Sequence, residues 1–176
     1  PPTEDEARVV PVAPTRQVAT SNGINEPAVI DGVTLGTVTE DAGEVLTTGG
    51  TLTVTDDNPG QAAFVAQPTV AGLYGSFTLA TGGAWTYAAD NNQAAVQGLG
   101  DGATLNDSFT ALTVDGSSQL VTVTLMGVND AAVIGGVTTG AVTEDAGASL
   151  TTSGALSITD PDAGEAAFTA QTGTTG

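Results

Sequence analysis

Short clusters of carboxylate and carboxamide side chains recur where strand-like segments of the chain end. Four such clusters fall in the first three quarters of the sequence: Glu40-Asp41, Asp56-Asp57-Asn58, Asp90-Asn91-Asn92 and Asn129-Asp130. Two of them return further on as Glu144-Asp145 and Asp160-Pro161-Asp162. The D-x-[DN] spacing places two oxygen side chains on the same side of a turn, where both can bind one hard cation. The clusters therefore predict calcium sites.

The alternative is that these residues only stabilise turns, because Asp and Asn side chains readily accept hydrogen bonds from their own backbone. The charge distribution favours calcium. Between residues 25 and 128 there are eleven carboxylates and no Lys or Arg, and the two cations of the chain, Arg8 and Arg16, precede this stretch. An acidic surface without internal counter-ions repels itself, so carboxylates that meet at a junction need cations from solution. Turn capping stays an open alternative for each single cluster.

Composition excludes several classes of function. The chain has 20 acidic and two basic residues, a formal charge of −18, which disfavours binding to nucleic acids and to anionic membrane surfaces. It has no Cys and no His, so disulfides, thiolate metal sites and the usual nucleophile–base pairs are absent. A carboxylate pair could in principle hydrolyse a glycoside, but nothing singles one out. We expect no enzyme, and no apolar run is long enough to span a membrane.

The sequence contains a long internal repeat. Val38-Thr39-Glu40-Asp41-Ala42-Gly43 returns as Val142-Thr143-Glu144-Asp145-Ala146-Gly147, and every matched pair is 104 residues apart, as 25 is from 129. Residues 25–72 and 129–176 are identical at about 28 of 48 positions. This period is the length of a whole domain. We expect a linker or the remnant of a preceding repeat at 1–24, one complete unit at 25–128, and the first half of a second unit at 129–176.

Period-2 alternation of Val and Leu with Thr and Ser predicts an all-β fold. About seven short strands in one unit favour an immunoglobulin- or cadherin-like Greek-key sandwich in tandem repeat. The expected strands include 28–38 and 62–67. We also expect a hairpin turn at Asp115-Gly116 and one helical turn within 91–99. Trp85 and Tyr87 fit a core position better than a sugar-binding one. The expected core residues are Trp85, Phe77, Phe109, Leu112, Val54 and Val123.

Several landmarks of the unit resemble the VCBS-type repeat, a bacterial cadherin-like domain of large secreted RTX-type adhesins. They are Val38-Thr39-Glu40-Asp41, Gly83-Ala84-Trp85-Thr86-Tyr87, Asp90-Asn91, Val96-Gln97-Gly98-Leu99, Asp107-Ser108-Phe109-Thr110, Asp115-Gly116 and Gly127-Val128-Asn129-Asp130. The resemblance covers 25–130 and leaves 1–24 uncovered. It implies type I secretion, display on the surface of Gram-negative bacteria, a role in adhesion and biofilm, and tandem domains stiffened by calcium.

The wider cadherin pattern implies where the ions bind. In that pattern Glu40 stands for the Glu of the first strand and Asp90 for an Asp at the base of the domain. Asn129 and Asp130 resemble the linker, and Asp160 and Asp162 resemble the acidic pair of the next domain. Two departures from the cadherin pattern lower the ligand charge. Asp90 is followed by Asn91-Asn92 and not by Arg-Glu, so one carboxylate is missing. In the first unit, Asn58 replaces the second Asp of the acidic pair. The full set of expected metal ligands is Glu40, Asp41, Asp56, Asn58, Asp90, Asn129, Asp130, Glu144, Asp160 and Asp162.

The leading hypothesis is a structural extender repeat whose partners are neighbouring repeats of the same chain. One alternative is a carbohydrate- or protein-binding sandwich module. Another is a subunit of an extracellular filament, because the half unit 129–176, with about three strands and an open edge, could exchange strands with another copy. The acidic, polar start is unlike a signal peptide. The missing initiator Met and the end in mid-repeat suggest a fragment of a longer protein.

Overall fold

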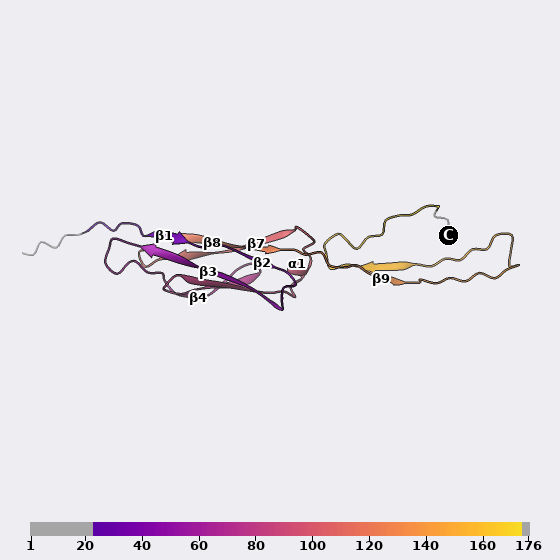
Figure 1. Cartoon of the computed structure of the whole chain (residues 1–176), viewed down its shortest axis with the longest axis horizontal. Helices are drawn as coiled ribbons and strands as arrows, with labels where there is room; N and C mark the ends of the chain where they lie inside the picture. Colours follow the sequence, from indigo (N-terminus) through magenta and orange to yellow (C-terminus); the bar gives the residue numbers. More distant parts are fainter. Residues whose placement is uncertain (1–22, 174–176) are drawn as a thin grey trace, which may run out of the picture.

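The computed structural model describes residues 23–173 as an elongated chain built almost wholly of β-strands. Residues 1–22 and 174–176 are outside the described part, and with them nearly all of the segment expected to be a linker or remnant repeat at 1–24. The described elements are ten strands and one short helix, α1 (Ala94–Gln97), so the all-β prediction is confirmed. Figure 1 shows a multi-stranded body followed along the same axis by a long open hairpin.

Eight strands in residues 25–128 form two sheets that enclose one core. The first sheet has the order β1-β3-β6-β5-β4 and is antiparallel: β1 (Val29–Gly32), β3 (Val45–Thr55), β6 (Ala84–Asp90), β5 (Gly75–Leu79) and β4 (Gln67–Ala71). The second sheet has the order β2-β8-β7: β2 (Leu35–Thr39), β8 (Ser118–Met126) and β7 (Thr104–Leu112). In this sheet β2 runs parallel to β8, and β7 runs antiparallel to it. The architecture is that of an all-β sandwich, whereas the Greek-key connection stays a prediction.

The core follows from the alternation along the strands. On β8, Val121, Val123 and Leu125 are fully buried, while the threonines between them are partly exposed. Successive side chains of a strand point to opposite faces of the sheet, so a strand of alternating Val and Thr buries one row and exposes the other. Phe77 stacks against Tyr87 and Phe109, with ring centroids 4.6 and 4.7 Å away, and joins the two sheets.

The prediction that Leu112 lies in the core is wrong. Leu112 is 40% exposed, and its neighbour Ala111 is fully buried instead. Phe109 and Leu112 are three residues apart on β7, so strand geometry cannot point both of them to the same face. The other expected core residues are buried, except that Val54 packs against the core while partly exposed. Residues 91–99 contain the expected helical turn, and Gly116 makes the expected turn between β7 and β8 with a φ of 93°.

The segment 28–38 contains two strands, where one was expected. β1 pairs with β3 in the first sheet, and β2 pairs with β8 in the second. Gly32, the last residue of β1, has a φ of 108°, a conformation that glycine adopts without strain. The strand expected at 62–67 is reduced to a single bridge between Phe64 and Thr113, and β4 begins only at Gln67. The unit therefore has eight strands, not seven.

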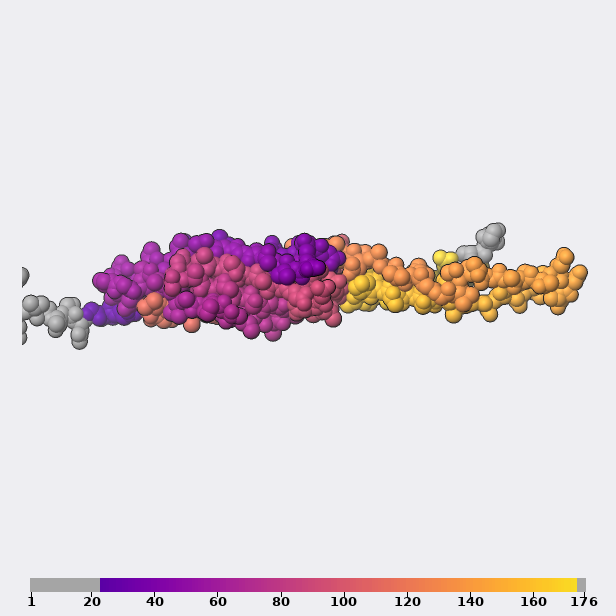
Figure 2. All heavy atoms as spheres, turned by 90° about the horizontal axis from the view of Figure 1, so that it is seen from below, coloured from indigo at the N-terminus to yellow at the C-terminus, as the bar shows by residue number. Residues whose placement is uncertain are grey.

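Residues 129–173 carry two strands, β9 (Val133–Gly136) and β10 (Leu156–Thr159), where about three were expected. Their antiparallel register, from Val133 opposite Thr159 to Gly136 opposite Leu156, equals that of β1 and β3 displaced by 104 residues. Figure 2 shows this part, orange to yellow, as a much thinner body than the unit that precedes it. The segment thus repeats one edge of the sandwich without the rest of it.

Candidate functional site

The acidic residues of the first unit gather at the end where its second sheet stops. Glu40 directly follows β2, and residues 128–130 follow β8 after a short interval. These two strands are parallel, with Thr39 opposite Met126, so their ends lie at the same edge. The backbone N–H of Glu40 donates to the carbonyl oxygen of Met126 at 3.0 Å, which extends the pairing by one residue. Sheet topology therefore brings Glu40 beside the chain that leads into the second unit.

The second unit adds the loop that follows β10. Asp160 and Asp162 form a D-x-D turn in which the backbone N–H of Asp162 donates to Asp160 Oδ1 at 2.9 Å. The backbone N–H of Asp130 donates to Asp162 Oδ2 at 2.8 Å. The backbone N–H of Ala163 donates across the junction to the carbonyl oxygen of Gly98 at 3.2 Å. This loop is thus held between the two units.

Two carboxylates at this junction are almost completely buried. Glu40 and Asp162 are each 2% exposed. Glu40 Oε1 accepts a hydrogen bond of 2.6 Å from the backbone N–H of Val128. Three other carboxylate oxygens are buried without any hydrogen-bond partner in the described part of the chain: Glu40 Oε2, Asp130 Oδ2 and Asp162 Oδ1. Buried charged oxygens without a partner are costly, and a bound cation satisfies them.

The pKa shifts reflect the same crowding. Burial raises the pKa of Glu40 above its ordinary value, and the negative charges of Asp41, Asp130 and Asp162 raise it further against the opposing hydrogen bond from Val128. Burial also raises the pKa of Asp130, with contributions from Asp41, Asp162 and Asp160. Carboxylates that lie close together disfavour one another's ionised form. A divalent cation would remove that penalty, and the donor set consists of oxygen atoms, as calcium prefers.

Glu165 belongs to the same site, although the sequence did not single it out. One carboxylate oxygen from each of Asp160, Asp162 and Glu165 lies within 4.8 Å of the others. The first unit has Gln61 at the equivalent position, 104 residues earlier. The acidic residue is therefore specific to the second unit, and comparing the two repeats position by position could have revealed it. These three residues could hold a metal ion.

The side chain of Asn91 hydrogen-bonds to Asp41, which follows β2, whereas the side chain of Asp90 bonds to Asn92. Asn91 Nδ2 donates to Asp41 Oδ1 at 3.0 Å, and Asn91 Oδ1 accepts from the backbone N–H of Asp41 at 3.1 Å. Gln97 Nε2 donates to Asp41 Oδ1 at 3.1 Å, and these hydrogen bonds hold the pKa of Asp41 below its ordinary value. Asp90 is exposed and accepts hydrogen bonds from the backbone and side chain of Asn92. For Asp90 the contacts are those of a turn cap.

The remaining expected ligands lie in three settings. Asn129 is exposed and donates from Nδ2 to the carbonyl oxygen of Asp130 at 2.6 Å, and Glu144 is exposed in the second unit. Asp56 and Asn58 lie after β3, where the Asn58 backbone N–H donates to Asp56 Oδ1 at 2.6 Å. The backbone N–H of Glu26 donates to Asn58 Oδ1 at 3.0 Å, and Asp56 Oδ2 is buried without a partner. These bonds match those of Asp130, Asp160 and Asp162 displaced by 104 residues.

Asp107 is a buried carboxylate with a structural role. It is 2% exposed and accepts hydrogen bonds from the backbone N–H groups of Leu73, Tyr74 and Gly75 at 2.8–3.0 Å, and from the Tyr87 hydroxyl at 3.1 Å. Burial raises its pKa, but these hydrogen bonds outweigh burial and hold the pKa below its ordinary value. Asp107 fixes the turn between β4 and β5, so it is no candidate ligand.

Trp85 and Tyr87 are buried in the core and are not exposed for sugar binding. Trp85 and Tyr87 are each 1% exposed, as the core prediction required. Trp85 Nε1 donates to the carbonyl oxygen of Val33 at 2.7 Å, so its polar atom is satisfied inside the sandwich.

In the described part of the chain, no helix is both long and apolar enough to cross a membrane.

Comparison with known proteins does not assign the chain to a family. Neither the scan against models of protein families nor the search of curated proteins finds a match. The resemblance to VCBS-type repeats therefore rests on the sequence landmarks alone.

Proposed function

We propose that the chain is a structural extender repeat of a VCBS-type bacterial adhesin, stiffened by calcium at the junction between its two units. The observation that carries this proposal is the set of buried carboxylate oxygens without partners, contributed by Glu40 and Asp130 before β9 and by Asp162 after β10. A cation bound there would have ligands from both sides of the junction. It would hold the second unit in line with the first.

In this proposal Glu40, Asp130, Asp160 and Asp162 hold the ion, with Glu165 beside them. The ion would supply positive charge and nothing else, because no reaction is involved. Without it, the ionised carboxylates repel one another and the hydrogen bonds of Asp130 to Asp162 and of Ala163 to Gly98 must hold the junction alone. We therefore propose a junction that is flexible without calcium and rigid with it.

An extender role is supported by the matching chemistry at the two ends of the complete unit. The loop with Glu26, Asp56 and Asn58 has the same backbone hydrogen bonds as the loop with Asp130, Asp160 and Asp162. An array of such units would present the same type of half-site at every junction. We place such an array outside the cell, on the surface of a Gram-negative bacterium, where calcium is abundant.

Small-angle scattering of the full chain tests this proposal. With millimolar calcium, the particle should become longer and stiffer than in EDTA. The double variant Asp130→Ala/Asp160→Ala should lose that change. The matched control is Glu144→Ala/Asp145→Ala, which removes two exposed acidic residues of the same unit outside the junction and should keep the full response. A calcium response that survives the first double variant would place the ion elsewhere.

A further inference from the structure

The loop after β3 and the loop after β10 share one set of hydrogen bonds. In the first loop the backbone N–H of Asn58 donates to Asp56 Oδ1 at 2.6 Å, and that of Gln61 donates to the carbonyl oxygen of Asn58 at 3.2 Å. The corresponding bonds of Asp162 and Glu165 in the second loop measure 2.9 and 3.3 Å. Both loops carry oxygen-bearing side chains at their first, third and sixth positions, namely Asp56, Asn58 and Gln61 in the first loop and Asp160, Asp162 and Glu165 in the second.

In the second loop these side chains converge around a buried oxygen atom that has no partner. One carboxylate oxygen from each of Asp160, Asp162 and Glu165 lies within 4.8 Å of the others. Asp162 is 2% exposed, and its Oδ2 accepts the hydrogen bond from the backbone N–H of Asp130. Its Oδ1 is buried without a partner in the described part of the chain. A buried charged oxygen is costly unless a donor or a cation satisfies it.

The first loop leaves oxygen atoms unsatisfied at the same positions. Asp56 Oδ2 and Gln61 Oε1 are both buried without a hydrogen-bond partner among the residues that the structure describes. They belong to the first and the sixth positions, the counterparts of Asp160 and Glu165. Two loops of different sequence therefore keep unpaired oxygen atoms at corresponding places, although only one of the loops lies at the junction between the units.

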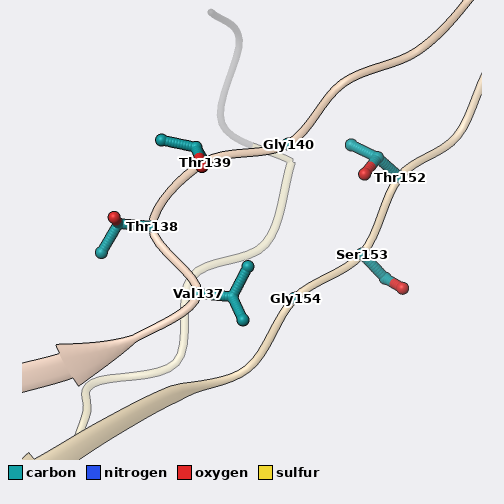
Figure 3. Close-up of a pocket in the computed structure, with 7 residues that line it drawn as sticks. All are labelled: Val137, Thr138, Thr139, Gly140, Thr152, Ser153 and Gly154. Atoms are coloured by element: carbon teal, nitrogen blue, oxygen red, sulfur yellow. The ribbon is translucent and has the colours of Figure 1, made fainter.

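A small cavity with acidic walls borders the first loop. Its volume is about 90 Å³, and its lining includes Glu26, Asp56 and Asp57. A larger cavity of about 200 Å³, shown in Figure 3, lies between residues 137–140 and 152–154. The residues that line this second cavity are Val, Thr, Ser and Gly, and none of them is a carboxylate. Hard divalent cations prefer carboxylate ligands, so the small cavity beside Asp56 suits an ion and the larger one does not.

We propose that each of the two loops is a self-contained cation site, in which the side chains at the first, third and sixth positions bind one calcium ion. This inference takes the identity of the ion from the proposed function, but the loop ion needs no ligand from the other unit. At the junction it is a second ion, next to the one that Glu40 and Asp130 hold, and Glu165 is its ligand. Calcium takes six to eight oxygen ligands, so water completes the coordination.

The two loops differ in charge, which ranks their affinities. The second loop offers three carboxylates, Asp160, Asp162 and Glu165, whereas the first offers Asp56 with two uncharged amides. The affinity of a calcium site depends on the number of charged ligands. The second loop should therefore bind calcium tightly and the first loop weakly. In an array of such units, the residues at the third and sixth positions would set the calcium concentration at which each loop fills.

Loss of one ligand charge is the first test, measured by isothermal titration of residues 1–176 with calcium. Glu165→Gln copies the sixth residue of the first loop and should weaken the binding of one ion at least about tenfold. Glu144→Gln is the matched control, because it removes the same charge from an exposed side chain of the same unit. It should leave the titration unchanged. Equal titrations for the two variants would overturn the proposal.

Gain of ligand charge is the second test. Asn58→Asp/Gln61→Glu gives the first loop the charge of the second loop and should add one tight calcium site. Asn106→Asp/Gln119→Glu adds the same charge on β7 and β8 and should add none. Calcium should also raise the melting temperature of the first double variant more than that of the wild type. If the first double variant gains neither a site nor stability in calcium, the three loop positions do not form a cation site.

Glu40→Gln separates the loop ion from the junction ion. It removes a ligand of the junction ion and leaves both loops intact, so it should abolish the scattering response to calcium and keep the tight loop site. If the loop variants behave as expected but calcium never stiffens the chain, the proposed function fails and the loop sites stand. If calcium stiffens the chain but neither loop variant changes calcium binding, the loop sites fail and the proposed function stands.

Discussion

The backbone N–H of Asp130 donates a hydrogen bond of 2.8 Å to Oδ2 of Asp162, across the loop that closes the junction. This bond brings two acidic residues together through one main-chain group. Asp130 Oδ2 and Asp162 Oδ1 remain buried without partners. In the first unit, Glu26 makes the same bond to Asn58, whose amide carries no charge. The loop therefore folds in the same way with or without the second carboxylate, which separates its structural role from its proposed role as a ligand.

Asp162→Asn should weaken the response to calcium without disrupting the loop. The amide oxygen can accept the bond from Asp130, as Asn58 does from Glu26, while one buried negative charge is lost. At a hundredfold excess of calcium over its Kd, the wild-type chain should gain about 2.7 kcal/mol of stability, and the variant should gain less. Differential scanning calorimetry in EDTA and in calcium measures both.

Asp145→Asn is the control for this substitution, because Asp145 is exposed in the second unit. It removes the same charge away from the cluster and should leave the calcium response as in the wild type. Identical responses of the two variants would count against Asp162 as a ligand.

Phe77→Ala should destabilise the complete unit by about 3–5 kcal/mol. Phe77 is fully buried between the rings of Tyr87 and Phe109, so its removal leaves a cavity that the two sheets cannot readily close. Leu112→Ala makes the contrast, since Leu112 is 40% exposed and should cost less than about 0.5 kcal/mol. Urea unfolding of both variants provides the comparison. A large loss in the free energy of unfolding for Leu112→Ala would show that Leu112 belongs to the core.

Sequence alone could predict what depends on local pattern. Alternation of Val with Thr identifies β8 and its buried row, and the D-x-D spacing identifies the loop at Asp160 and Asp162. Apolar character alone favours Leu112, but Leu112 is an odd number of residues from the buried Phe109 and therefore faces the other side of β7. A consistent phase along β7 would have selected Ala111.

Sequence could not predict the features that depend on which strands meet. Asn91 reaches Asp41 because α1 and the turn after β6 fold back toward the end of β2, and nothing in the local sequence ranks Asn91 above Asp90. Asp107 is buried because the turn between β4 and β5, more than thirty residues earlier, places three backbone N–H groups around it. Such partners are set by tertiary packing.

Asp107→Asn should lower the stability of the complete unit at neutral pH and reduce its loss in acid. The pKa of Asp107 is held below 3.8 in the folded state, so the unfolded chain takes up the proton first as the pH falls. The stabilisation is therefore present above 3.8 and is lost as the pH falls through the lower folded value. Asparagine has one oxygen in place of two, which leaves buried N–H groups unpaired at a cost of about 1–3 kcal/mol.

Urea unfolding at neutral pH and at about pH 3 measures both parts of this expectation. Asp101→Asn is the control, because Asp101 is exposed in a turn and should change neither part. If Asp107→Asn and the wild type lose equal stability on acidification, another carboxylate is responsible for the acid sensitivity.

Hydrogen exchange should divide residues 129–173 according to which strand partners are present. The amides of β9 and β10 that bond across the hairpin should exchange more slowly than those of 139–143 and 149–155, whose counterparts pair with β8 and β6. A two-stranded hairpin is only marginally stable in water, so even β9 and β10 should show modest protection. Mass spectrometry of residues 1–176 contains its own control. Residues 35–39 and 45–51 are identical to 139–143 and 149–155 at 7 of 12 positions, are paired with β8 and β6, and should be strongly protected. Equal protection of 139–143 and 35–39 would mean that residues 139–143 find a strand partner within residues 1–176, which contradicts this prediction.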